Sequence, residues 1–350
     1  MKEKKICGIQ QVGIGVPDCE KGWRWYHDNF GFDVKIVDAD GVAERMLPYT
    51  GGKPQPRRSM IALNVQGGGG FEIWQPKERE LNWLFSPVQL GDLGLLEAKV
   101  KCPDAGKAFE AFRSRGLDVV GSLRTSPSGL KWFSVRDPWG NLFRIEEDGY
   151  IFCKLGQLTG GAGGMVIGVS DMDSSVAFYS RLLDYDKVCY DGTAVFEDLA
   201  GLPGGGKELR RVILARSKPI EGPLSPLFGT SCLELIQATG GPGKKLYADR
   251  YWGDPGFIHL CFDVRNMAAI KAEAEALGHP FVCDSGADFE MGDANGHFTY
   301  VEDPDGTLIE FVETFKVPLS KRPPIVLDLT KKDDSKPLKF LKALRFLRSK

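Results

Sequence analysis

Short runs in which apolar and polar residues alternate recur along the chain, and this pattern is typical of strands with one buried face. One run, QVGIGVPD at 11–18, leads into a helical stretch that ends in Trp25-Tyr26. A similar run, GMVIGVSD at 164–171, leads into a helical stretch that ends in Phe178-Tyr179, with the same Asp-to-Tyr spacing. Each then reaches a strand in which Glu lies between apolar residues, at 71–73 and 233–235. The first part of each half is therefore one repeat, named A and A′.

The second part of each half repeats in the same way. The strand at 95–100 is followed by a helix that ends at Gly116 and by DPWGNLFRIEE at 137–147. The strand at 259–264 is followed by a helix that ends at Gly278 and by DPDGTLIEFVE at 303–313. DPxG is a tight-turn signature between two strands. The chain therefore reads as four repeats in the order A, B, A′, B′, each with one strand, one helix and three strands.

These repeats predict two modules of two repeats each, at residues 1–155 and 156–318, followed by a tail at 319–350. The glycine-rich stretch 160–164 is the expected linker between the modules. The last fifteen residues carry six basic groups and no acid, with leucines at 338, 341, 344 and 347. We expect this basic C-terminal tail to form a terminal helix that packs on the body, in preference to a membrane-surface or acidic-partner segment.

Composition narrows the class of protein. The 45 Lys and Arg side chains nearly balance 47 Asp and Glu side chains, which argues against nucleic-acid binding. No apolar run approaches the roughly 20 residues of a transmembrane segment, and no signal-like stretch follows the charged N-terminus. The eight cysteines lack CxxC spacing and are typical of reduced thiols. The expectation is a globular cytoplasmic protein.

Strand alternation places four polar residues on equivalent faces. In repeat B′, Leu260, Phe262 and Val264 share the face expected beneath the helix, so His259 lies on the other. Glu310 likewise points away from Ile309 and Phe311. In repeat A the same parity applies to Gln11 and Glu72. If the sheet curls into a cup, these side chains converge in it.

The repeats, their FY-ending helices and the DPDGxxxE hairpin resemble the vicinal oxygen chelate superfamily over residues 6 to about 315. That superfamily includes glyoxalase I, extradiol dioxygenases and bleomycin resistance proteins. The resemblance implies an α+β fold of four βαβββ repeats in two cup-shaped modules. It also implies that each repeat can offer one ligand from its first strand and one from its last. The positions are Gln11 and Glu72 in A, Leu95 and Arg144 in B, Gly164 and Glu234 in A′, and His259 and Glu310 in B′.

Two pairings of the repeats are open. If neighbours pair, as in extradiol dioxygenases, one cup holds Gln11 and Glu72, and the other Glu234, His259 and Glu310. If the first repeat pairs with the fourth and the second with the third, as in fused glyoxalase I, one cup collects Gln11, Glu72, His259 and Glu310. The other cup would then be inactive. We favour the exchanged pairing because it assigns every intact ligand position except Glu234, and the four residues resemble the ligand set of zinc-type glyoxalase I.

A set of two carboxylates, an imidazole and an amide oxygen suits one divalent ion, Zn, Ni, Mn, Co or Fe, without choosing among them. By resemblance, the activity is that of a glyoxalase-like lyase or isomerase acting on a small oxygenated metabolite through a metal-bound enolate. Glu310 is the expected base, with Glu72 as a possible second base, and Gln11 and His259 are structural ligands. His297 is expected either at the surface or in the cavity wall.

The family pattern fails where glutathione would bind. Gly15, Pro76 and Pro255 stand where glyoxalase I has basic and amide side chains, so we expect a substrate other than a glutathione conjugate. An alternative is a metal-free small-molecule binding protein of the antibiotic-sequestering type, in which Trp74 stacks on the ligand. An extradiol-type dioxygenase is a weaker alternative because it needs two histidine ligands. A monomer can complete its own cup, and a homodimer is equally compatible.

Overall fold

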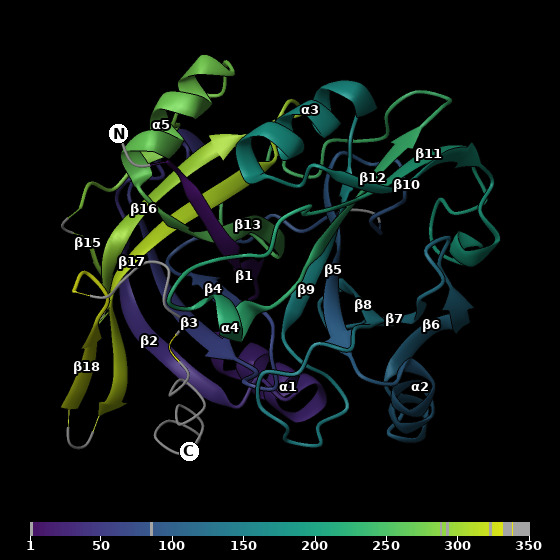
Figure 1. The fold of residues 1–350 in the computed structure, drawn as a ribbon, viewed down its shortest axis with the longest axis horizontal. Helices are drawn as coiled ribbons and strands as arrows, with labels where there is room; N and C mark the ends of the chain where they lie inside the picture. The colour runs from purple at the N-terminus through teal and green to yellow at the C-terminus, as the bar shows by residue number, and fades with distance from the viewer. Residues whose placement is uncertain are drawn as a thin grey trace.

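The computed structural model describes residues 3–84, 87–287, 289–291, 294–321, 324–331 and 338. Within them the strands form two sheets, which lie side by side in Figure 1. The first sheet contains β1 (Lys5–Gly15), β2 (Val34–Ala43), β3 (Gln55–Leu63), β4 (Gly70–Pro76), β13 (Gly256–Arg265), β14 (Cys283–Asp284), β15 (Phe289–Met291), β16 (Ala294–Glu302), β17 (Leu308–Lys321) and β18 (Pro324–Asp328). The second contains β5 (Gly94–Cys102), β6 (Asp118–Thr125), β7 (Lys131–Arg136), β8 (Leu142–Glu147), β9 (Ala162–Gly168), β10 (Lys187–Ala194), β11 (Leu209–Ala215) and β12 (Cys232–Ala238).

The strand order confirms the exchanged pairing. The first sheet runs β14-β16-β17-β13-β1-β4-β3-β2, so it joins repeat A to repeat B′ through the antiparallel pair β1 and β13. The second runs β10-β11-β12-β9-β5-β8-β7-β6 and joins B to A′ through β5 and β9. The two cups are therefore called the A–B′ cup and the B–A′ cup. The boundaries at 155 and 318 stay a prediction.

Most helices pack on the faces of the sheets opposite the cups: α1 (Cys19–Phe30), α2 (Ala105–Ser114), α3 (Met172–Leu183) and α5 (Met267–Ala276). The short helix α4 (Ser225–Phe228) differs, because its Leu227 and Phe228 side chains line the cavity of the A–B′ cup. Short 3-10 turns lie at Leu47–Tyr49 and Glu197–Leu199. Side chains of one strand parity, such as Val12, Phe262 and Phe311, are buried with helix residues in one large core cluster. This leaves the opposite parity for the cups, as the alternation predicts.

The two sequence motifs that mark the repeats make the same hydrogen bond twice. Asp18 caps α1, and Tyr26 near the end of that helix donates its hydroxyl to Asp137 of the DPWG turn at 2.7 Å. In the second half Tyr179 donates to Asp303 of the DPDG turn at 2.8 Å. These bonds connect A to B and A′ to B′, whereas the sheets connect A to B′ and B to A′. The two cups are therefore tied together by one such buried hydrogen bond in each half of the chain.

The glycine-rich stretch 160–164, the expected linker between the modules, is buried and runs into a strand, since β9 begins at Ala162. Ala162 bridges Gly69 of repeat A, and a Cβ on Gly161 would meet the Gly69 carbonyl oxygen at 2.4 Å. The glycines are needed because two backbone segments approach closely there.

The C-terminal region adds to the first sheet. β17 extends to Lys321, β18 pairs with it, and the Leu338 amide donates to the Pro223 carbonyl at 3.0 Å. Leu341, Leu344 and Leu347 of the predicted tail helix lie outside the described residues. All eight cysteines lie within the described residues and are free thiols. Among the described helices, none combines the length and apolar character that crossing a membrane requires.

Candidate metal centre

The four residues selected from the sequence converge on the floor of the A–B′ cup. They lie on its four central strands, whose register sets Gly13 opposite Glu72 and opposite His259, and Cys261 opposite Glu310. Glu72 is 2% exposed, His259 0% and Glu310 5%. Two sequence segments nearly 250 positions apart thus meet because β1 pairs with β13.

The ligand atoms of Glu72, His259 and Glu310 all lie within 4.8 Å of one another. His259 Nε2 is 3.2 Å from Glu72 Oε2 and 3.1 Å from Glu310 Oε2. Despite these distances, Nε2 is buried without a partner in hydrogen-bond geometry. Neighbouring ligand atoms about 2.1 Å from an ion are about 3.0 Å apart in octahedral geometry. The spacing and the orphaned nitrogen therefore fit a divalent ion.

Gln11 completes the group. Its Nε2 atom lies 2.9 Å from Glu72 Oε2 and 3.5 Å from Glu310 Oε2, so the amide donates to the carboxylates. Coordination requires the amide oxygen at this place, and half a turn of the amide plane exchanges the two atoms. The Gln11 amide thus lies directly beside the cluster of Glu72, His259 and Glu310.

Electrostatics couple the histidine to the carboxylates. Burial lowers the pKa of His259, but the charges and hydrogen-bonding capacity of Glu310 and Glu72 outweigh it and raise this pKa to about 9. Burial raises the pKa of Glu310, yet His259 brings it below its ordinary value. Without an ion the imidazole is therefore protonated near neutral pH, and ion binding must displace that proton.

Three further residues hold the imidazole, and the sequence did not single them out. The Tyr300 hydroxyl lies 3.4 Å from His259 Nδ1, and the Trp252 ring lies parallel to the imidazole with centroids 6.4 Å apart. Gly13 leaves room for the ring, since a Cβ there would lie 2.4 Å from His259 Cε1. A partner on Nδ1 fixes which nitrogen faces the carboxylates. The sequence did contain one indication of Tyr300, because the antiparallel pairing of its strand with β17 sets Tyr300 opposite Glu310.

A cavity of about 300 Å³ opens above the carboxylates, and Gln11, Glu72 and Glu310 form part of its wall. Trp74 also lines it, as the alternative function requires, and packs edge to face on Trp252 at 4.4 Å. Arg57, which the sequence did not indicate, lines the cavity with its guanidinium over the Trp74 ring at 4.7 Å. His297 lines the cavity too, while its Nε2 pairs with Asp284 at 2.6 Å.

The B–A′ cup differs from the prediction at one position. β5 and β8 pair Lys99 with Arg144, as β13 and β17 pair Cys261 with Glu310. The position equivalent to His259 is therefore Glu97, not Leu95. A register shift between Leu95 and Glu97 reverses the alternation, so Leu95 packs in the helix-side core. Arg144, Gly164 and Glu234 occupy the positions that the sequence assigned to them.

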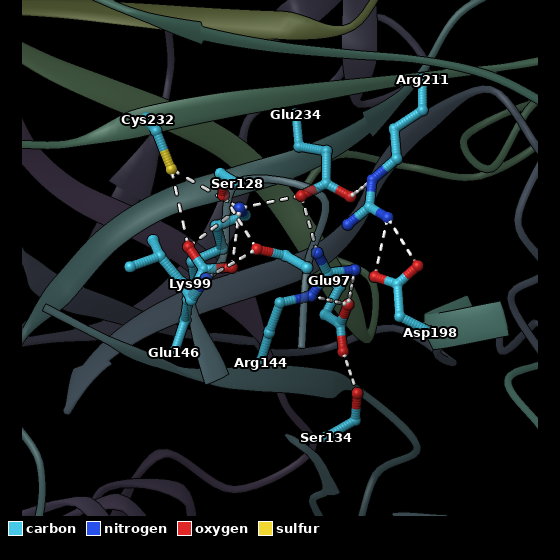
Figure 2. Close-up of polar contacts among 12 residues, drawn as sticks. Glu97, Lys99, Ser128, Ser134, Arg144, Glu146, Asp198, Arg211, Cys232 and Glu234 are labelled. Carbon is cyan, nitrogen blue, oxygen red and sulfur yellow. Dashed lines mark hydrogen bonds and ion pairs between the residues drawn. The ribbon is translucent and has the colours of Figure 1, made fainter. Parts of the chain in front are cut away.

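Figure 2 shows the guanidinium of Arg144 between the carboxylates of Glu97 and Glu234. Its Nε donates to Glu97 at 2.9 Å, and its Nη1 donates to Glu234 at 2.7 Å. Glu234 also pairs with Arg211 at 2.8 Å and with Lys99 at 2.9 Å. Burial raises the pKa of Glu234, but these three cations together hold it well below its ordinary value. In the B–A′ cup the Arg144 guanidinium thus lies at the place that corresponds to the cluster of Glu72, His259 and Glu310 in the A–B′ cup. Glu234 belongs to the ion network around Arg144.

Comparison with known proteins agrees with this architecture. The family model described as Glyoxalase/Bleomycin resistance protein/Dioxygenase superfamily matches residues 8–145 and 161–311. The chain belongs to this superfamily. Among curated proteins, no sequence matches the chain.

Solved structures of the superfamily share the fold at low identity. Glyoxalase I from Zea mays is 14% identical with a TM-score of 0.55, covering 99% of this chain and 96% of that chain. A putative dioxygenase from Bacillus subtilis subsp. subtilis str. 168 is 12% identical with a TM-score of 0.57, covering 88% of this chain and 86% of that chain. At such identities the likeness concerns the fold, and the reaction has to be argued from the site.

Proposed function

We propose that this superfamily member is a divalent-metal-dependent lyase or isomerase that acts on a small oxygenated metabolite. The observation that carries the proposal is the buried cluster of Glu72, His259 and Glu310, joined by Gln11, on the floor of a cavity. Those four residues are the proposed ligands. An ion bound there would act as a Lewis acid toward a substrate carbonyl.

The protein groups would handle the proton. A carboxylate in contact with the cavity can take a proton from the carbon beside a carbonyl and return it to a neighbouring carbon, so that atoms and electrons balance. Glu310 is the proposed base because it faces the cavity and its pKa lies below its ordinary value, which keeps it ionised at neutral pH. Glu72 comes from β4, whereas Glu310 comes from β17, and Glu72 is the proposed second base.

A glutathione conjugate is not the proposed substrate. Gly15, Pro76 and Pro255 carry no side-chain donor at the positions where glyoxalase I places its glutathione contacts. A cytoplasmic location and a cup completed within one chain are further parts of the proposal.

The test is hydrogen exchange at carbon. Metal-loaded protein is incubated in D2O with a panel of 2-oxo and 1,2-dioxygenated compounds, and loss of the proton beside the carbonyl is followed by NMR. We expect exchange of at least one compound by the native protein and none by Glu310→Gln at saturating metal. A His27→Asn variant, altered on the exposed side of α1 and outside the cavity, should keep the exchange. Exchange at equal rates in native protein and Glu310→Gln would refute the assignment of the base.

A metal-free binding protein is the second candidate, and the aromatic wall favours it. Trp74 and Trp252 meet edge to face beside the cluster and could receive an apolar or aromatic ligand. Tight binding of such a ligand after exhaustive chelation, with no exchange activity in the presence of metal, would favour this function over catalysis.

A further inference from the structure

The cavity of the A–B′ cup extends from the carboxylates in one direction along β17. Glu310, Val312, Thr314 and Lys316 alternate along that strand, and all four line the cavity. At about 3.4 Å per residue, Glu310 and Lys316 are about 20 Å apart. On the opposite side Ile61 pairs with Glu72, and Leu63 follows one pleat further. The cavity thus has an arm that leads away from the proposed metal centre.

The walls of this arm are mainly apolar, and three repeats build them: A and B′ of the A–B′ cup, and A′ of the other cup. Its apolar lining consists of Ile36, Val37, Leu63, Leu224, Leu227, Phe228, Val312 and Val317. Leu224, Leu227 and Phe228 come from repeat A′, whose strands belong to the other sheet. They close the arm from outside the A–B′ cup.

Hydrogen bonds fix this closing segment in place. The Leu227 carbonyl accepts from the Gly68 amide at 2.8 Å, and the Ser225 hydroxyl donates to the Cys7 carbonyl at 2.8 Å. A Cβ on Gly8 would lie 2.9 Å from Phe228 Cβ, so the segment is also packed tightly on β1. The apolar wall is therefore a built feature of the fold.

Two polar side chains in the arm, Thr314 and His297, already have partners, and Lys316 at the far end is exposed. The Thr314 hydroxyl accepts from Gln10 at 2.9 Å and lies 3.2 Å from Asp263 Oδ1. His297 pairs with Asp284. A ligand group in the arm would consequently gain mainly from burial of apolar surface and little from hydrogen bonds.

On the other side of Glu72 the wall is aromatic and polar. Trp74, Trp252, Met46 and Tyr300 belong to one buried cluster there, and the exposed residues Val42, Glu44 and Arg45 also line the cavity at that end. A ligand that places oxygen atoms at the carboxylate cluster therefore finds the continuous apolar wall along the arm toward Val312 and Phe228.

From this geometry we infer that the substrate joins an oxygen-bearing, metal-chelating head to an apolar alkyl or aryl tail that lies in the arm. The metal-chelating head of the substrate rests on the proposed function. The apolar tail is inferred independently, from the residues that line the arm.

A series of linear hydroxamic acids tests both parts, because the head is constant and the tail grows from acetohydroxamate to octanohydroxamate. Affinity for zinc-loaded protein is measured by calorimetry. We expect each added methylene to strengthen binding by up to about fourfold. Val312→Thr, in the wall of the arm, should weaken octanohydroxamate about tenfold and leave acetohydroxamate within about twofold. The matched control is Val188→Thr, an exposed strand position on β10 of the second sheet, which should change neither affinity.

The outcomes separate the two ideas. If acetohydroxamate binds only with metal but affinity does not rise with tail length, the apolar tail is wrong and the metal centre stands. If octanohydroxamate binds equally well without metal and acetohydroxamate does not bind, the arm is supported and the metal centre fails. If neither compound binds, the combined inference is refuted. Unchanged affinity for acetohydroxamate shows that Val312→Thr still folds.

Discussion

Replacing Arg144 by Met should destabilise the protein strongly, although Arg144 lies far from the candidate metal centre. Arg144 is 0% exposed and holds Glu97 and Glu234 together. After the replacement, Glu234 keeps Arg211 and Lys99, whereas the Glu97 carboxylate keeps the hydrogen bond from the Ser134 hydroxyl and the more distant charge of Arg124. Removal of one partner from a buried ion pair costs about 3–5 kcal/mol, because the other charge stays buried. With an unfolding entropy of about 2.1 cal/mol/K per residue, this corresponds to a melting temperature lower by about 4–7 °C.

Differential scanning calorimetry at low ionic strength measures this effect. The matched control is Arg210→Met, on the same strand as Arg211, whose ion pairs with Asp173 and Asp191 are exposed to solvent and are worth about 0–1 kcal/mol. The double variant Arg144→Met/Glu97→Gln should recover much of the loss, because the unpaired charge is gone. If Arg144→Met costs no more than Arg210→Met, or if the double variant loses the sum of the single effects, the reasoning about the buried network is wrong.

Two other perturbations follow from the motifs and from the packing of His259. Burial raises the pKa of Asp137 from its ordinary value of 3.8 to about 6. Protonation of Asp137 therefore contributes to the stability of the folded protein below pH 3.8, and this contribution is lost as the pH rises through 6. Tyr26→Phe removes the hydroxyl that donates a hydrogen bond to Asp137. The loss in free energy of unfolding, measured with urea, should be about 1 kcal/mol larger at pH 8 than at pH 5, because hydrogen bonds to a charged carboxylate are stronger than those to a neutral one. Equal losses at both pH values would contradict this. Gly13→Ala should displace the His259 ring and weaken zinc binding in competition titrations. Gly106→Ala should not, because its Cβ would make only ordinary van der Waals contacts, the nearest at 3.5 Å. Native affinity in Gly13→Ala would show that the ring can move aside.

Much of the fold and of the A–B′ cup could be predicted from the sequence because both depend on local patterns. Alternation in strands that are buried on both sides assigned Gln11, Glu72, His259 and Glu310 to one face, and the exchanged pairing followed from gathering these four. The pairing of the repeats depends on long-range contacts, which the local alternation of residues cannot predict. The choice between the two pairings therefore came from the residue types at the four positions.

Other features depend on contacts that no single segment encodes. A register shift moved Glu97 into the position predicted for Leu95, and a shift of one residue reverses the face of every following side chain. Arg144 was identified as a non-ligand, but its place between two carboxylates became visible only when β8 and β12 were brought together. The wall that Leu227 and Phe228 supply to the other cup likewise depends on how the repeats pack.

Metal content of the purified protein tests the central claim most directly. Native protein, the double variant His259→Ala/Glu310→Ala and the second-cup variant Glu234→Gln are reconstituted with zinc, dialysed and analysed for metal per chain. We predict about one tightly held ion per chain in native protein and in Glu234→Gln, and none in the double variant. Absence of metal from native protein after reconstitution, or retention of the ion by the double variant, would contradict the assignment of the A–B′ cup as a metal centre.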